Sequence, residues 1–527
     1  MSNHQPGPRA GRTFWHDLPA SLVVFLVALP LCMGIAVAAG VPVAAGIITG
    51  IVGGLVVGAL AGSPLQVSGP AAGLTVLVFE IVSDPALGLP MLGVIVLGAG
   101  LVQIAAGLFR LGQWFRAVSP AVVEGMLAGI GVLIVASQFH VMLDDDLRGD
   151  GLANLLAFPD AIVKVMNSGD ATHDEAAQVG LLTILVLVLW KVAAPKKWQV
   201  VPAPLVAIVV ATATAVGLQQ SGIWPQLRPV AMPDQLWDEV RLPSVESLTR
   251  VREGPVLLAI FSVAFIASAE TLLCATAVDQ LHRGPRTRYD RELAAQGVGN
   301  ALCGLLGALP MTGVIVRSAA NVEAGARTRL SAVLHGAWLL LAAALLPATL
   351  RLIPRAALAA VLVYTGYKLM NLQAIRKLRE FGRGEVLVYT VTLVTVVATD
   401  LLTGVLAGVL LALAKLLHTF CHLRARLVID KPTSEGKRPR AVLHLEGAAT
   451  FLRLPKLATV LEGVPARAEL HVHFEHLSYI DHACLELLVN WEKQHEATGG
   501  SLAIDWDSLT ARFHSPPFRA RRSRSGV

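Results

Sequence analysis

A succession of apolar runs, from Leu18 to about residue 425, constrains this chain more than any other feature. Short polar breaks separate the runs, and one crossing of the bilayer core needs about 20 apolar residues. Only 15% of the residues are charged, against roughly a quarter in soluble proteins. The sequence therefore predicts an α-helical polytopic membrane protein. Its fourteen candidate segments lie at residues 18–40, 42–61, 69–83, 88–109, 120–138, 177–194, 202–218, 254–279, 290–309, 313–325, 330–350, 353–371, 384–400 and 402–421.

Composition and charge argue against several other classes of protein. The first run, Leu18 to Gly40, is longer than a signal-peptide core and no small-residue cleavage site marks it, so we expect a retained first helix. The five cysteines show no paired spacing, so no disulfide framework, metal site or cofactor is predicted. The net charge of +6 fits basic cytoplasmic loops that follow the positive-inside bias, and no nucleic-acid partner is expected.

Two pairs of prolines indicate an internal repeat. Pro70 and Pro310 each mark a segment too short to cross the bilayer, 240 positions apart, and Pro120 and Pro354 each begin a later span, 234 positions apart. This offset favours two halves of seven segments, which must sit in the membrane with opposite orientation because seven is odd. The sequence thus predicts a 7+7 inverted repeat; chance matches between Gly-, Ala- and Pro-rich segments are the alternative explanation.

The composition changes after His418. Strand-like and helical runs alternate there up to about Trp506, which predicts a small soluble α/β domain. An even number of spans places this domain on the side of the N terminus, and we expect that side to be cytoplasmic. Four regions are predicted: a cytoplasmic N-terminal segment at 1–17, a transmembrane domain at 18–425, the α/β domain at 426–510 and a basic, disordered tail at 511–527.

Ionisable residues inside apolar runs are candidate functional residues, because a charge is expensive to bury in a membrane. Glu80 and Asp400 lie at segment ends, where interfacial solvation explains them. Glu124 lies one turn into its span, where the helix dipole favours a negative charge. Glu270 lies in mid-span, and we expect it either to pair with Arg317 or to carry a proton, since burial disfavours the charged carboxylate. A purely structural ion pair is the alternative.

Arg317 belongs to a stretch, Pro310 to Ser318, whose residues indicate an unwound segment that opens a half helix. The stretch from Ser68 to Thr75 has the same pattern. Free backbone N–H groups at a helix start bind an anion, and an arginine adds charge and a hydrogen-bond fork. Two such starts that meet near the midplane predict an anion site. The alternative for Arg317 is a side chain that snorkels to the interface.

At these residues the chain resembles the SulP family of anion transporters, which includes pendrin and prestin. The C-terminal segment resembles the STAS domain of that family, with the signature from Leu477 to Leu485. The other matching motifs are Asp17-Leu18-Pro19-Ala20, Leu29-Pro30, Ser68-Gly69-Pro70, the stretch from Pro310 to Arg317, Asn321, Ala324-Gly325-Ala326 and the turn from Gly404 to Gly408.

The resemblance implies a homodimer in the cell (cytoplasmic) membrane, with a core domain that moves like an elevator against a gate domain. The third and tenth helices would face each other with the anion between their N termini, and Glu270 on the eighth helix would couple ion movement to transport. The implied substrate-binding residues are Ala71, Ala72, Gly73, Gly313, Val314, Ile315 and Arg317, with Cys32 and Met33 of the first span nearby.

Two departures from the family pattern change what we expect. Regulatory STAS proteins carry a phosphorylatable serine directly after the aspartate, whereas this chain has His482, so no phosphorylation switch is expected there. Sodium-coupled bicarbonate carriers of the family use a hydroxyl-bearing residue where this chain has Ile315. The missing oxygen ligand disfavours sodium relative to a proton or to anion exchange.

The predicted function is therefore secondary active transport of a small anion: sulfate, bicarbonate or a small dicarboxylate. A nucleobase carrier of the same architecture and an anion-sensing signalling or motor protein are the alternatives. No nucleophile–base pair stands out, so no enzyme is predicted. Four histidines near the signature form no closed ligand set for a metal: His471, His473, His476 and His482.

Overall fold

The computed structural model describes residues 10–113, 119–145, 151–167, 171–195, 198, 201–224, 227–233, 235–420, 422–430 and 439–504. The predicted tail at 511–527 lies outside the described residues, and helix α1 begins at Ala10, within the predicted N-terminal segment. The chain divides into two compact units, Met1–Val409 and Leu410–Val527.

Each of the fourteen predicted segments coincides with a helix. Seven form the first half: α1 (Ala10–Ala38), α2 (Val43–Val52) with its continuation through the π-helical turn η1 (Gly53–Val57) into α3 (Gly58–Leu60), α4 (Thr75–Ser83), α5 (Gly88–Leu108), α6 (Pro120–Met142), α9 (Ala171–Ala193) and α10 (Ala203–Gln220). Seven form the second half: α12 (Gly254–Leu281), α13 (Tyr289–Leu305), α14 (Ile315–Glu323), α15 (Leu330–Leu345), α17 (Arg355–Leu369), α19 (Arg383–Ala398) and α20 (Leu401–Phe420).

Shorter helices fill the connections between these segments. They are α7 (Gly151–Leu156), α8 (Phe158–Asn167), η4 (Leu236–Glu239), α11 (Val245–Thr249), η5 (Arg250–Arg252), α16 (Pro347–Arg351) and α18 (Leu372–Glu380).

Length and hydropathy confirm a multi-span membrane protein. In the described part of the chain, eight helices are long and apolar enough to cross a bilayer. Helices α4 and α14 have nine residues each and are therefore only about 14 Å long, half of a crossing. The two short segments predicted from the sequence are thus half helices.

An extended pair of strands joins the two half helices. Strand β1 (Ser68–Pro70) runs into the 3-10 turn η2 (Ala72–Leu74) and then α4, and β2 (Met311–Gly313) leads to α14. The strands are antiparallel, with Gly69 opposite Thr312. Equivalent parts of the two halves, 243 positions apart, therefore cross in the middle of the helical unit.

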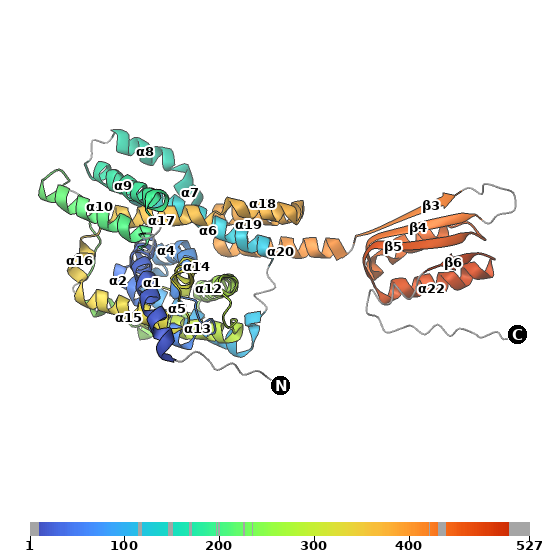
Figure 1. Ribbon diagram of the computed structural model, residues 1–527, viewed down its shortest axis with the longest axis horizontal. Helices are drawn as coiled ribbons and strands as arrows, with labels where there is room; N and C mark the ends of the chain where they lie inside the picture. The colour runs from blue at the N-terminus through green and yellow to red at the C-terminus, as the bar shows by residue number, and fades with distance from the viewer. Residues whose placement is uncertain are drawn as a thin grey trace. The chain divides into compact units, whose positions relative to one another are not determined.

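The membrane helices form two groups around this crossing. Helix α6 packs on α17 and α19, and α9 packs on α10 and α17. In the other group α5 packs on α13 and α12, and α15 packs on α2 and α1. Figure 1 shows α6, α9, α10, α17 and α19 on one side of α1, α12 and α14.

Glycines permit a close contact between helices α5 and α13. A Cβ at Gly304 would lie 2.2 Å from the backbone nitrogen of Leu97, and a Cβ at Gly100 would lie 2.3 Å from that of Ala301. Small residues let membrane helices approach backbone to backbone, so these two glycines permit the tight packing of α5 on α13.

The C-terminal unit contains the α/β domain expected from the sequence. Its sheet has the order β3-β4-β5-β6. Strand β3 (Leu423–Asp430) is antiparallel to β4 (Arg440–Ala449), which is parallel to β5 (Glu469–Ile480), and β6 (Ser501–Ala503) is parallel to β5. The 3-10 turn η6 (Phe451–Arg453) leads into helix α21 (Leu454–Glu462), and helix α22 (His482–Ala497) follows β5. The two helices contribute Leu457, Cys484 and Leu488 to one core with the sheet. Figure 1 shows α22 along one face of this sheet.

Candidate functional site

A cavity of about 450 Å³ lies beside the crossing of β1 and β2. Its wall includes residues of α1, α6, α12 and α17 as well as both half-helix starts. Seven of the predicted site residues line it: Ala72, Gly73, Glu270, Gly313, Val314, Ile315 and Arg317.

Backbone hydrogen bonds fix the two half-helix starts. The Ala71 N–H donates to the Pro310 carbonyl over 3.1 Å, and the Val314 N–H donates to the Val67 carbonyl over 2.9 Å. No side chain caps η2 at Ala71 or α14 at Val314. The next N–H groups of each start therefore adjoin the cavity with the positive end of a helix dipole behind them, which is the geometry of an anion site.

Arg317 is fully buried, so it does not snorkel to an interface. Its Nε and both Nη atoms have no hydrogen-bond partner within the described residues. The guanidinium lies over Gly69, where a Cβ would come within 1.9 Å of an Nη atom. A buried cation without a partner is costly, so this side chain is positioned to bind an anionic ligand.

Glu270 also lines the cavity, on α12. Its carboxyl group adjoins the Gly73 N–H and the Thr312 side chain, and its Oε2 atom lies 2.9 Å from where a Cβ of Gly73 would be. No ion pair joins Glu270 with Arg317 in the described part of the chain, so the structural ion pair considered from the sequence is not formed.

Three predicted site residues lie outside the cavity wall, and one residue that was not predicted as part of the site lies on it. Ala71, Cys32 and Met33 are buried but are not part of the cavity wall. Cys32, on α1, lies close to Arg317. Glu124 of α6 does line the cavity, whereas its place one turn into a helix suggested only a favourable charge at an N terminus.

A buried polar network between α13 and the residues of and before β1 supports the crossing, and the sequence did not predict it. The fully buried Glu292 accepts hydrogen bonds from the Ser63 N–H over 2.9 Å and from Gln66 Nε2 over 3.0 Å. Gln296 Nε2 donates to Ser68 Oγ in β1 over 2.5 Å. Helix α13 thus fixes the position of β1. Glu292 opens the predicted segment 290–309, so an acid at a segment end was the available signal.

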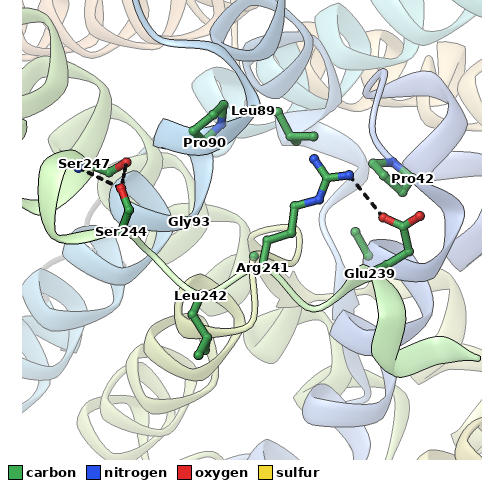
Figure 2. Close-up of a pocket in the computed structure, with 11 residues that line it drawn as sticks. Pro42, Leu89, Pro90, Gly93, Glu239, Arg241, Leu242, Ser244 and Ser247 are labelled. Carbon is green, nitrogen blue, oxygen red and sulfur yellow. Dashed lines mark hydrogen bonds and ion pairs between the residues drawn. The ribbon is translucent and has the colours of Figure 1, made fainter.

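A second, smaller cavity of about 130 Å³ lies near the starts of α2 and α5. Figure 2 shows its Arg241 turned toward Glu239, to which it is joined over 3.4 Å. Because Arg241 is more than half exposed and already paired, this cavity lacks the desolvated cation of the larger one.

The half helices, their crossing and the buried arginine define a class of protein: a helical membrane protein of the inverted-repeat transporter type. The chain belongs to the sulfate permease family, whose model matches residues 14–392. The resemblance to the SulP family is thereby confirmed.

Two relatives show how far the similarity in sequence extends. It is 27% identical over 415 residues to the putative sulfate transporter YvdB of Bacillus subtilis (strain 168), covering 76% of this chain and 73% of the relative. It is 26% identical over 411 residues to the bicarbonate transporter BicA of Picosynechococcus sp., covering 75% and 69%.

Solved structures show the same fold. The transmembrane domain of a cyanobacterial bicarbonate transporter BicA matches with a TM-score of 0.62 at 25% identity, over 75% of this chain and 97% of that one. The murine anion transporter Slc26a9, in its inward-facing state, matches with a TM-score of 0.72 at 15% identity, over 99% and 93%. At 15% identity the second match speaks for the fold alone.

Proposed function

We propose that this protein is a secondary active transporter of small anions. The observation that carries the proposal is the fully buried Arg317, which has no acidic partner among the described residues, beside two uncapped half-helix starts at the wall of a cavity. Backbone dipoles and a guanidinium together stabilise an oxyanion. The binding residues proposed are those predicted from the sequence, with Ala72, Gly73, Gly313 to Ile315 and Arg317 on the cavity wall.

The substrate proposed is sulfate, bicarbonate or a small dicarboxylate. The names of the relatives support the first two, since they are a putative sulfate transporter and a bicarbonate transporter. A cavity of about 450 Å³ has room for any of the three.

Alternating access is proposed to follow from movement of one helix group against the other. Gly73, Glu270 and Arg317 lie on the group with α12 and α14, whereas Leu362 and Thr365 of α17 lie on the opposite wall. An elevator-like displacement of the first group would carry the anion past the second. A homodimer, as in the family, would hold the second group still.

The cavity is proposed to open to the cytoplasm. Its wall reaches Gln280, one residue before the end of α12, and Pro120, the first residue of α6. The connection after α12, residues 282–288, carries three arginines, Arg283, Arg286 and Arg288, and basic loops stay inside. The N terminus and the α/β domain are likewise proposed to lie on the cytoplasmic side of the cell membrane.

Uptake into proteoliposomes tests the proposal. Labelled sulfate, bicarbonate and fumarate are offered to the full-length protein with an inward proton gradient, with an inward sodium gradient and with neither. We expect one anion to be taken up, driven by protons or by exchange for an internal anion. Binding without flux would instead support the sensing alternative. The absence of both binding and flux would contradict the proposal.

The variant Arg317→Ala tests the site itself. Loss of a charge-assisted contact is expected to weaken anion affinity by about 10- to 100-fold. Arg241→Ala is the matched control, because Arg241 is exposed and paired with Glu239. An unchanged affinity in Arg317→Ala would remove this arginine from the site.

A further inference from the structure

The ionisable groups on the cavity wall do not balance for an anion site. The wall carries one guanidinium, Arg317, and two carboxyl groups, Glu124 and Glu270. With both carboxylates ionised, these side chains sum to one negative charge, and the two half-helix starts, each worth about half a positive charge, bring the wall close to neutral. One bound proton then gives the wall about one positive charge, which matches a monoanion, and a second proton gives the charge that matches a dianion.

The two carboxyl groups lie on opposite helix groups. Glu270 is on α12, beside Gly73. Glu124 is on α6, which packs on α17 and α19. The neighbours of Glu270 and Glu124 are therefore different, and a proton on one does not substitute for a proton on the other.

Among the described residues, the titratable and charged groups around Glu124 come from four helices, α18, α19, α12 and α14. Lys377 on α18 and Tyr389 on α19 interact with it electrostatically. Glu270 and Cys274 of α12 and Arg317 of α14 face it across the cavity. No ion pair within 4 Å joins Glu124 to Lys377 or Arg317 in the described part of the chain. Its charge is thus not neutralised by a direct partner.

We propose that Glu124 is a second proton-binding site of the transport cavity, distinct from Glu270, and that its protonation is required for entry of a dianion. The inference rests on the proposed anion transport. Binding of the anion and binding of the proton at Glu124 promote each other, because each lowers the electrostatic cost of the other, and this linkage is reciprocal. The number of protons bound then follows the charge of the anion: a dianion such as sulfate needs two.

The test measures how anion affinity depends on proton concentration. Binding of labelled sulfate to the purified full-length protein is measured between pH 5.5 and 8.5, together with proton-driven uptake. The slope of log affinity against pH is expected to approach −2 in the wild type, −1 in Glu124→Gln and in Glu270→Gln, and zero in the double variant. Glu323→Gln is the control, because Glu323 is an exposed carboxylate of α14 away from the cavity wall.

The outcomes separate the inference from the function on which it rests. A wild-type slope retained in Glu124→Gln would overturn the role of Glu124 while leaving anion transport intact. A wild type that binds none of the anions would overturn both. If Glu124→Gln binds the anion but does not transport it, the slope of log affinity against pH still decides whether Glu124 binds a proton. If that variant does not fold, Glu124→Ala and Glu124→Asp are measured, of which only the aspartate is expected to restore the slope.

Discussion

At the residue scale, one contact determines where the cation of the site lies. The guanidinium of Arg317 occupies the space over Gly69, which a side chain would fill. The arginine therefore stays buried beside β1 only because residue 69 has no Cβ. Affinity for an anion depends on a glycine that touches no ligand.

The variant Gly69→Ala tests this dependence. Its Cβ would meet an Nη atom of Arg317 at 1.9 Å, so the guanidinium must move. We expect anion affinity to fall by about 10-fold, on the order of 1.4 kcal/mol, measured by labelled-sulfate binding. Gly217→Ala is the control, because nothing lies within 4 Å of a Cβ there. Equal affinities in the two variants would show that the contact has no role.

Glu270 carries a separate prediction about coupling. An ionised carboxylate on the cavity wall repels an anion, and a protonated one does not. Wild-type uptake is therefore expected to fall as pH rises, and Glu270→Gln is expected to make this profile less steep and to weaken the dependence of uptake on the proton gradient. Initial uptake rates between pH 5.5 and 8.5 check it. A profile that keeps the wild-type steepness in this variant would assign coupling elsewhere.

At the element scale, helix starts differ in how their first N–H groups are satisfied. Asp400 accepts a hydrogen bond from the Thr403 N–H over 2.9 Å at the start of α20, and Asp481 accepts one from the Cys484 N–H over 2.9 Å at the start of α22. The starts of η2 and α14 combine the lack of a side-chain cap with a place on the cavity wall. It is this combination, and not the missing cap alone, that makes them candidates for binding an anion.

The variant Asp481→Ala tests the cap of α22. Asp481 also accepts a hydrogen bond from the Phe451 N–H, so it joins η6 to this helix. Loss of an N-cap is expected to destabilise the C-terminal unit by about 1 kcal/mol. Amide hydrogen exchange in α22 should rise by about 5-fold, whereas Glu486→Ala, an exposed change in the same helix, should not alter it. Unchanged exchange would mean that the cap is dispensable.

At the scale of the whole membrane unit, the cavity lies between two helix groups and reaches only one set of helix ends. Residues of both groups are needed to form it. In the proposed mechanism, displacement of one group along the other would close this access and expose the site on the opposite side.

Cysteine labelling tests access to the cavity. In a variant without native cysteines, Leu273→Cys on the cavity wall is expected to react with a membrane-impermeant thiol reagent from the cytoplasmic side. Bound anion should slow the reaction severalfold. Leu281→Cys, at the exposed end of the same helix, should react at the same rate with and without anion. Labelling of residue 273 only from outside, or without protection by any transported anion, would contradict the proposed access.

The sequence by itself determined the membrane class, the fourteen segments, the α/β domain and seven residues of the cavity wall. Hydrophobic run length, proline and glycine spacing and isolated charges are local properties, and they survive folding unchanged. The half helices were recognisable because the apolar segments at 69–83 and 313–325 are too short to cross a bilayer.

Only the tertiary structure decided which groups face one another. Glu124 and Glu270 are 146 positions apart, and Gly69 and Arg317 are 248 apart, so no local pattern links them. The structure left Glu270 without the expected arginine partner, placed Glu124 on the cavity wall and put Glu292 behind the crossing. The physical reason is that the direction of a side chain depends on how its helix packs, and that packing is set by contacts between distant segments.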